Sequence, residues 1–534
     1  LAGGVIALAP SQAFATLEGH EASPGDPFSS CVGIGAGPEF GAVNYPNTEP
    51  EVWLAKNPAS PNNFIGAIQQ DRWNDGGDKG LVAPWSFDDG YHWGETPLPF
   101  SLCAAQYYGG KVLPTERASD PWVSIGPDGK AYTVSISFDE NTFKNGVGAA
   151  TSADGGVSWH NQKFVDFNAD IGPLTSFDDK ESVTADPVRV GVAYAVWDQL
   201  RFFVLPTCPT ARVPHAGDLP AHRGFPVDPV CFSGPAMFSR TTDGGVTWEP
   251  ARPIVPPVTD EQTIANQIVV DPRSGTLYNF YEYILVTGAL QIRMVFSNDK
   301  GLTWSAPQVV VADHNPVGTH DPQTGAPARD GAIIPSPAVD PHTGQLYIAF
   351  QDSRYNTSGE DDVLFSTSVA GGLTGSWTVP QRVDTPSDIG TFTPAIKVND
   401  LSQLGIDYYS LDQPQLGPNV WPVDRFMRIS TGPAAVSPPQ PGQAPTASIS
   451  FATPTHDGGP FNMLAAPNAF GFFVGDYEGM AVDRDGKSFH SFFSSMNCDD
   501  ANCTAPFNPT GAPQESKAPP DPMDVYTAAY YKAG

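Results

Sequence analysis

The chain of 534 residues is short of positive charge, of cysteine and of long apolar runs. Lys and Arg number 28 against 58 Asp and Glu, and the resulting net charge of -30 argues against nucleic acid and anionic membranes as partners. Beyond the N-terminus, no apolar stretch is long enough to span a membrane. No Cys/His spacing is typical of zinc sites, and no EF-hand-like spacing supports calcium binding. We therefore expect no required cofactor, although a Ca²⁺ held by loop carboxylates stays open.

The N-terminus and the six cysteines favour secretion. Residues 1–15 are interpreted as the apolar remnant of a signal peptide, with Ala13-Phe14-Ala15 as an A-x-A-like cleavage site; the alternative is an ordinary buried strand. An even set of cysteines suits an oxidising compartment, and proximity suggests three disulfides: Cys31–Cys103, Cys208–Cys231 and Cys498–Cys503. We expect a secreted, extracellular monomer.

No convincing long amphipathic helix is present, whereas 53 Gly and 55 Pro are typical of turn-rich β structure. One motif, S-x-D-x-G-x-x-W, recurs at wide intervals, which marks repeated supersecondary units. Its four copies are Ser86–Trp93, Ser152–Trp159, Thr241–Trp248 (with Thr for Ser) and Ser297–Trp304. The hydroxyl and the carboxylate can bond nearby backbone N–H groups, Gly allows positive φ, and Trp packs back onto the sheet.

A second pattern, two apolar strands joined by a turn, occurs seven times. The copies are Glu51–Gln70, Pro121–Ser137, Ser182–Trp197, Gln267–Tyr283, Pro337–Gln351, Pro394–Tyr409 and Gly479–Ser494. Two strands plus a motif hairpin make four, which is one propeller blade. The sequence therefore predicts an all-β, seven-bladed β-propeller, with six blades as the alternative. Residues 16–534 would form it as a single domain, with long loop insertions near 199–236 and 429–475.

The recurring motif resembles the Asp-box (BNR) repeat of sialidase-like β-propellers. The resemblance implies that the boxes lie on the face away from the functional mouth. Loops that enter the first strand of each blade and leave the second would then build the mouth. The polar segments at these places include Glu116–Asp120, Asp178–Glu181, Arg329-Asp330 and Asp476–Glu478.

An Asp followed closely by an Arg leaves the second strand in three blades. These pairs are Asp71-Arg72, Asp198 with Arg201, and Asp352 with Arg354. Arg offers a planar fork that matches a carboxylate, so three forks at one mouth could hold a sugar acid; the alternative is that each Arg pairs with its neighbouring Asp. The predicted substrate-binding residues are Arg72, Arg117, Arg354, Asp71, Asp120 and Glu181. The predicted catalytic residues are His320, Tyr283, Tyr355 and Arg201. Any metal site stays unknown.

Three functions compete. Most of the chain resembles Asp-box propellers that include secreted rhamnose-α-1,4-glucuronate lyases, on the segments Gln69–Gly77, Glu116–Ser124, Asp178–Pro187 and Ser239–Pro250. This resemblance implies a lyase that releases rhamnose from a terminal uronate of an acidic plant-type polysaccharide. In such a β-elimination, Arg side chains would neutralise the carboxylate while His320 or a mouth Tyr removes the C5 proton.

The first alternative is an exo-acting sialidase-like glycoside hydrolase, which needs an Arg triad, a Tyr nucleophile with a Glu partner, and an Asp acid/base. Its acid/base candidates here are Asp71, Asp120, Glu181 and Glu282. The chain lacks the family's Arg-Ile-Pro signature ahead of its first box, since Arg72 is followed by Trp and Asn. The second alternative is a non-catalytic, glycan-binding propeller. All three have an acidic or other glycan as partner.

Overall fold

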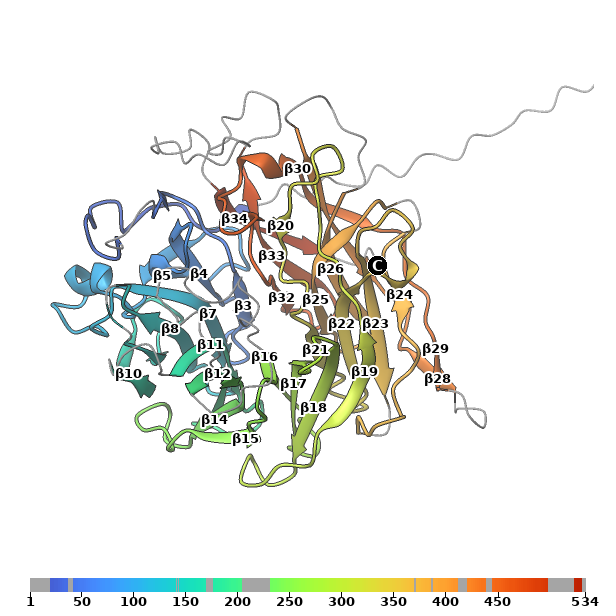
Figure 1. Cartoon of the computed structure of the whole chain (residues 1–534). Coiled ribbons are helices and arrows are strands. Elements are labelled where there is room, and N and C mark those ends of the chain that lie inside the picture. Colours follow the sequence, from blue (N-terminus) through green and yellow to red (C-terminus); the bar gives the residue numbers. More distant parts are fainter. Residues whose placement is uncertain are drawn as a thin grey trace, which may run out of the picture.

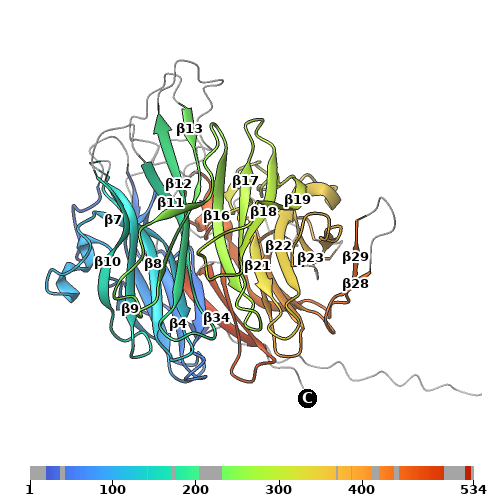
Figure 2. The same cartoon turned by 90° about the horizontal axis from the view of Figure 1, so that it is seen from below.

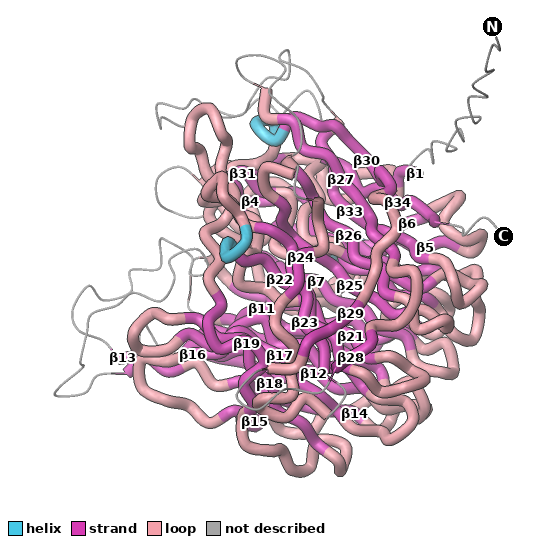
Figure 3. Tube along the Cα trace, turned by 90° about the vertical axis from the view of Figure 1, so that its right-hand side faces the viewer, coloured by secondary structure: helices cyan, strands magenta, loops and turns pink. Residues whose placement is uncertain are grey.

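The computed structural model of the chain describes residues 20–36, 42–140, 142, 144–169, 176–203, 231–368, 371–385, 388–411, 420–437, 444–497 and 523–530. Strands dominate this part of the chain (Figure 3). Its helical turns are short 3-10 pieces: η1 (Leu102–Tyr107), η2 (Ser353–Tyr355) and η3 (Met463–Ala465). The predicted all-β class is confirmed.

The strands pair in chain order into units of four antiparallel neighbours, which we call blades (Figure 1). Blade 1 holds β3 (Trp53–Lys56), β4 (Phe64–Trp73), β5 (Asp78–Ser86) and β6 (Gly94–Pro97), and β2 (Asn44–Tyr45) adds to β4. Blade 2 holds β7 (Arg117–Ile125), β8 (Ala131–Phe138), β9 (Asn145–Ser152) and β10 (His160–Asn168). Blade 3 holds β11 (Ser176–Ala185), β12 (Ala193–Phe203), β14 (Ala236–Thr241) and β15 (Arg252–Val255), and β13 (Cys231–Ser233) adds to β12. Figure 2 shows β12 and β13 extending beyond the neighbouring strands.

The second half of the chain continues in the same way. Blade 4 holds β16 (Gln262–Val270), β17 (Leu277–Ile284), β18 (Leu290–Ser297) and β19 (Gln308–His314). Blade 5 holds β21 (Ser336–Val339), β22 (Leu346–Asp352), β23 (Asp362–Ser368) and β24 (Gln381–Arg382). Blade 6 holds β25 (Thr391–Val398), β26 (Leu404–Ser410), β27 (Pro422–Ile429) and β30 (Thr455–Asn462). The last unit, blade 7, holds β32 (Gly479–Val482), β33 (Phe489–Met496), β34 (Met523–Tyr530) and β1 (His20–Glu21). Two small pairs stand apart: β20 (Ala328–Arg329) with β31 (Phe472–Phe473), and β28 (Ala435–Ser437) with β29 (Thr446–Ser448).

The blades form a closed ring. The first strand of each blade is innermost and contacts the first strand of the next, and β32 contacts β3 to complete the circle. The first and the last strand of the described residues share one sheet, because β1 pairs with β34 (Figure 3). Blades 1 and 2 are joined into one nine-stranded sheet by the pairing of Asp78 with Ala118, so sheets and blades do not correspond one to one. The number seven therefore stays a prediction, while the propeller arrangement is observed.

All four Asp boxes form the predicted turn between the third and fourth strands. In the first, Ser86 Oγ donates to Asp88 Oδ1 (3.0 Å) and accepts from Gly90 N (3.0 Å), and Trp93 Nε1 donates to Gly90 O (3.0 Å). The glycine at this place has a φ of +83°, which a side chain would strain. Strand direction alternates within a blade, so these turns lie at the ring's opposite end from the entrance to each first strand. We call these ends the box end and the mouth.

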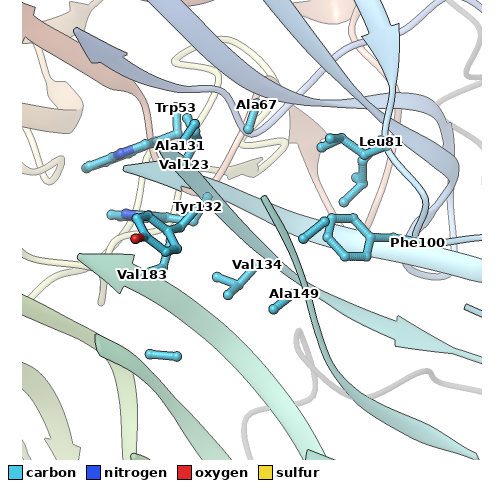
Figure 4. Close-up of a cluster of buried hydrophobic side chains, with 14 of the residues drawn as sticks. Trp53, Ala67, Leu81, Phe100, Val123, Ala131, Tyr132, Val134, Ala149 and Val183 are labelled. Carbon is cyan, nitrogen blue, oxygen red and sulfur yellow. The ribbon is translucent and has the colours of Figure 1, made fainter. Parts of the chain in front are cut away.

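Apolar side chains fill the space between successive sheets (Figure 4). The largest cluster joins Trp53 and Leu81 of blade 1 with Val123 and Val134 of blade 2 and Val183 of blade 3. Each blade therefore buries its faces only against its neighbours, as expected of a ring of sheets.

The predicted Cys31–Cys103 disulfide is present, with 5.5 Å between the Cα atoms, and ties the N-terminal segment to η1. Cys231 is also disulfide-bonded, but Cys208, Cys498 and Cys503 lie outside the described residues. So do His215, His222 and the proposed signal remnant. Within the described ranges, we find no helix of the length and apolarity needed to cross a membrane.

Candidate functional site

The inner strands share a distortion at the mouth. The ladders of β7, β11, β16 and β25 each shift register near their start. Inside each shift lies a non-glycine residue with positive φ: Asp120 (+53°), Lys180 (+46°), Ala265 (+59°) and Thr393 (+49°). Such bulges bend a strand and re-aim its side chains, and strained backbone of this kind concentrates at functional sites.

Two of these strained residues line one small pocket at the mouth. Its volume is about 40 Å³, which suits a carboxylate-sized group and not a sugar ring. The lining residues are Arg72, Asp75, Gly76, Gly77, Ser119, Asp120, Ile136, Phe138, Phe177, Asp179, Lys180, Arg329 and Phe470. Three cations and three carboxylates thus surround a cavity on the strained side of the inner strands.

Lys180 is the centre of a charged network that joins four blades. Its Nζ donates to Glu51 Oε1 (3.0 Å), Asp120 Oδ1 (3.2 Å) and Asp476 Oδ2 (2.7 Å). All four side chains are buried. An unpaired buried charge is very costly, so this mutual pairing holds the strained bulges in place.

The network shifts the pKa values of two neighbouring carboxyl groups, Glu51 and Asp120, in opposite directions. Burial, together with the charge of Asp120, raises the pKa of Glu51 well above its ordinary value. Burial also opposes ionisation of Asp120, but Lys180 and a hydrogen bond from Glu51 outweigh it and lower the pKa of Asp120 to about 2. The pKa of Glu51 is thus shifted upward and that of Asp120 downward, although both carboxyl groups contact the same Lys180 Nζ. Two neighbouring titratable groups whose pKa values are shifted in opposite directions are typical of acid/base sites.

Two arginines complete the pocket. Arg72 and Arg329 stack on the same ring, Phe473, with 4.8 and 4.6 Å from guanidinium carbon to ring centroid. Arg329 pairs with Asp476 through Nε (3.0 Å) and Nη2 (2.5 Å). By contrast, Arg72 Nη1 makes only long contacts, to Gln69 Oε1 (3.3 Å) and Asp78 Oδ2 (3.5 Å), and its buried Nε has no partner among the described residues. Arg72 is therefore the guanidinium with the most unused bonding capacity in the pocket.

The insertion near 429–475 reaches this site. β31 of that insertion pairs in parallel with β20, which sets Phe473 beside Arg329. Phe470, from the same insertion, is 46% exposed and forms part of the pocket wall. The predicted insertion also contains β30 of blade 6, so it is the connection between β30 and β32 that supplies the outer, aromatic part of the pocket.

Among the ten predicted site residues, the pocket brings together Arg72 and Asp120. It does not bring Arg201 or Arg354 beside Arg72. Arg201 Nε donates to Gln199 Oε1 (2.7 Å) within its own strand. Arg354 is clamped by Asp352, through Nε (2.7 Å) and Nη2 (2.6 Å), so the neighbour-pairing alternative describes Arg354.

The other predicted binding residues, Arg117, Asp71 and Glu181, do not line the pocket. Arg117 is fully buried, where Nη1 bonds Asp75 Oδ1 (2.8 Å) and Gly76 O (2.6 Å). Asp71 accepts from Lys79 Nζ (2.7 Å). Glu181 is buried near Asp120 with a pKa raised well above its ordinary value by burial, and neither carboxyl oxygen has a recorded hydrogen bond.

The predicted proton-transfer residues also lie away from the lining. Tyr283 donates to Glu261, and its ring lies under Arg293. Tyr355 is 44% exposed and donates to Pro380 O (3.0 Å). His320 is partly exposed, with Nδ1 3.7 Å from Glu360 Oε2.

Sequence reasoning placed Asp179, Lys180, Arg329 and Asp476 at the mouth without giving them a role. Glu51 and Phe473 were missed as site residues. The position of these residues was a signal in the sequence that could have identified them. A charged residue at the start of an inner strand lies where the bulge turns its side chain toward the axis. Within the described part of the chain, no group of three His, Cys, Asp or Glu is arranged to hold a metal ion.

No protein-family model matches the chain. A curated relative, the sialidase of Micromonospora viridifaciens, is 26% identical over 202 residues, or 36% of this chain and 29% of that protein. The chain therefore matches less than a third of that relative's length.

Similar solved structures include a mutant of NanB sialidase from Streptococcus pneumoniae (TM-score 0.42, 9% identity, 91% of this chain and 94% of that one). An α-L-arabinanase of Penicillium chrysogenum with arabinobiose has a TM-score of 0.39 at 13% identity over 77% and 98% of the two chains. The Hadza microbial sialidase has a TM-score of 0.39 at 16% identity over 68% and 64%. The named neighbours are thus enzymes of the sialidase and arabinanase kind, and none of these three supports the lyase subtype.

Proposed function

We propose that this protein is a secreted glycoside hydrolase that acts on a terminal acidic sugar of a glycan at the mouth pocket. One observation carries the proposal: Arg72, Lys180 and Arg329 surround a cavity into which the ionised carboxylate of Asp120 opens. The sialidase relative adds a precedent for a glycan substrate. The disulfide Cys31–Cys103 suits an oxidising, extracellular compartment.

The pocket has room for the carboxylate of the substrate. Burial raises the pKa values of Glu51 and Glu181 well above their ordinary values, which weakens the competition of these two carboxyl groups for Arg72, Lys180 and Arg329. The Nε of Arg72, which has no hydrogen bond among the described residues, lies on the same side of the guanidinium as Nη2, and these two nitrogens can form a fork-like pair of bonds to a carboxylate. Because the cavity is only about 40 Å³, the sugar ring would lie outside it, against the exposed face of Phe470.

Asp120 is the proposed acid/base residue. It is ionised, it lines the cavity, and it is hydrogen-bonded to Glu51, whose pKa is raised well above its ordinary value by burial and by the charge of Asp120, so that Glu51 can exchange a proton with it. Asp179 adds a second carboxyl group to the same wall, so the pocket has the carboxyl pair that most glycosidases require. The nearby Tyr477 donates to Pro121 O (3.2 Å), and its phenol pKa is raised well above its ordinary value by burial and adjacent carboxylates. The Tyr nucleophile of sialidases therefore has no counterpart in this lining.

The reaction products distinguish the proposed hydrolase from a lyase and from a non-catalytic binding propeller. Wild-type protein would be incubated with aryl glycosides of sialic and glucuronic acid, with arabinan, and with a rhamnosyl-glucuronate oligosaccharide. A hydrolase frees sugar without new ultraviolet absorbance; a lyase generates an absorbing unsaturated uronate. Sugar release that is abolished in Asp120→Asn supports the proposal. Absorbing product would establish the lyase instead, and absence of turnover on every acidic glycan would leave the binding propeller.

A further inference from the structure

A second cavity lies on the axis of the ring, with a volume of about 390 Å³, which is within the range of small-molecule sites. The inner strands β3, β7, β11, β16, β21, β25 and β32 all contribute to its wall. The apolar part includes Trp53, Trp122, Ile125, Val183, Ile268, Val339, Val398 and Val482. Trp53, Val123 and Val183 line this cavity and also belong to the cluster of buried apolar side chains drawn in Figure 4.

An aromatic layer separates this axial cavity from the mouth network. Trp53 and Trp122 stack with 3.4 Å between ring centroids, and Tyr477 packs on Trp122 at 5.2 Å. Lys180 Nζ lies 5.9 Å from the Tyr477 ring, on the mouth side. The two cavities share no lining residue. The axial cavity is therefore a separate site from the proposed catalytic pocket.

The charge of the axial cavity is opposite to that of the chain. Its lining contains Lys56 and Lys397 but no Asp or Glu, although the net charge of the protein is -30. Lys56 Nζ donates to Asp483 O (2.6 Å). Lys397 has no ion pair recorded with any described residue, and its Nζ lies 4.9 Å from the centre of the Trp53 ring.

Lys397 is thus a partly buried ammonium group that has no ion pair within the described part of the chain. The carboxylate of Asp407, whose charge acts on it, is already paired with Arg425 Nη2 (2.9 Å). Burial lowers the pKa of Lys397 to about 8, so the group is still mostly charged at neutral pH. A buried charge is costly unless it is paired, and an anion in the cavity would pair it.

We propose that the axial cavity binds a small organic monoanion with a flat, apolar body. Its carboxylate would pair with Lys397 Nζ, and its body would lie against the Trp and aliphatic walls. The charge specifies an acid over its neutral analogue, because the ammonium then gains a charge-assisted bond.

Benzoate is a suitable probe, with benzamide as the neutral analogue of the same shape. Isothermal titration should show benzoate binding at least about tenfold tighter than benzamide. Lys397→Met, which keeps the length and removes the charge, should abolish this preference, while the exposed Lys111→Met control should keep it. Arg72→Ala should also keep it, which separates this site from the mouth. Equal affinities for acid and amide, or an unchanged preference in Lys397→Met, would overturn the proposal.

A second measurement covers the case in which Lys397→Met fails to fold. An amine-directed acylating reagent would be applied to the wild-type protein, and modification would be read at each Lys by mass spectrometry. Benzoate should protect Lys397 and leave Lys111 unprotected. Equal modification of Lys397 with and without benzoate rejects the site.

Discussion

The two ends of the ring use repetition in opposite ways. At the box end the same residues recur, and the hydroxyl-to-carboxylate distance is 3.0, 2.8, 2.9 and 2.8 Å in the four boxes. At the mouth the same backbone bulge recurs, but its strained residue is Asp, Lys, Ala or Thr. Residues thus repeat where a side chain closes its own turn, and they differ where the side chain faces a shared axis.

The pKa values of the carboxyl groups also differ between the box end and the mouth. The box carboxylates accept local hydrogen bonds, and those from Thr247 and Thr303 lower the pKa values of Asp243 and Asp299 to about 2. Carboxyls near the mouth are buried, and their pKa values diverge: burial raises the pKa of Asp361 to about 7 and that of Glu478 to about 8, whereas Lys180 outweighs burial and lowers that of Asp120 to about 2. The acidity of a box carboxylate is therefore set by its own turn, and that of a mouth carboxyl by the charges it meets from other blades.

The largest effect is expected from Asp120→Asn, which removes the mouth charge and keeps the shape. Loss of a positioned acid/base should lower kcat by about 10²–10⁴-fold. The matched control is Asp271→Asn, in the turn between the first two strands of blade 4, where the carboxylate bonds Arg273. The measurement is initial rate on whichever glycan the wild type cleaves. If Asp120→Asn keeps more than about a tenth of the activity while folding normally, the mouth is not the catalytic end.

The next largest effect distinguishes Arg72 from Arg354, two arginines for which the sequence pattern predicted the same role. Arg72→Lys keeps the charge but loses the fork, so kcat/KM should fall by about 10–100-fold. Arg354→Ala should change kcat/KM by less than about threefold and lower Tm instead, because Arg354 is bonded to Asp352. Both variants are compared in the same assay and by calorimetry. A larger loss of kcat/KM in Arg354→Ala than in Arg72→Lys would instead place the carboxylate site beside Arg354, where the second strand of blade 5 ends.

These arginines show what the sequence could and could not predict. The boxes predicted the all-β propeller because each one is a local turn whose residues must be neighbours in the chain. The Asp-Arg pairs had the same local form, but the geometry that decides their role is not local: Arg72 stacks on Phe473, about four hundred residues away in the insertion. Lys180 likewise acquires its partners from three other blades. No spacing within one repeat specifies which residues meet at the axis.

Stability should have an acidic optimum. The raised pKa values of Asp361 and Glu478 mean that the folded state binds protons that the unfolded state releases above pH 3.8–4.5. Their contribution is complete below that range and is lost as the pH rises through 7–8. The lowered pKa values of the box carboxylates act oppositely, and their contribution is lost below about pH 4. Buried His490, whose pKa burial lowers to about 4, also disfavours folding as the pH falls below 6.5.

Calorimetry from pH 3 to 9 tests this expectation. The Tm should be highest between about pH 5 and 6 and should fall by about 5 °C or more by pH 8.5. Asp361→Asn mimics the protonated group and should flatten the alkaline side of the curve, whereas the box variant Asp243→Asn should leave that side unchanged. A Tm that rises steadily from pH 5 to 8.5 would contradict the assignment of raised pKa values to the mouth.

The smallest effect is expected at the box end itself. Asp243→Ala removes the hydrogen bonds that Asp243 accepts from Thr247 N (2.8 Å) and from the hydroxyls of Thr247 (2.6 Å) and Thr241 (2.9 Å), all at a solvated turn. We expect a loss of about 1 kcal/mol in unfolding free energy and no change in kcat. Asp299→Ala in the next blade should cost the same, because its bonds match those of Asp243. Since the two boxes share no partner, the double variant should be additive within about 0.5 kcal/mol. Strong non-additivity, or any loss of turnover, would mean that the boxes are coupled through the ring to the mouth and that the two ends are not independent.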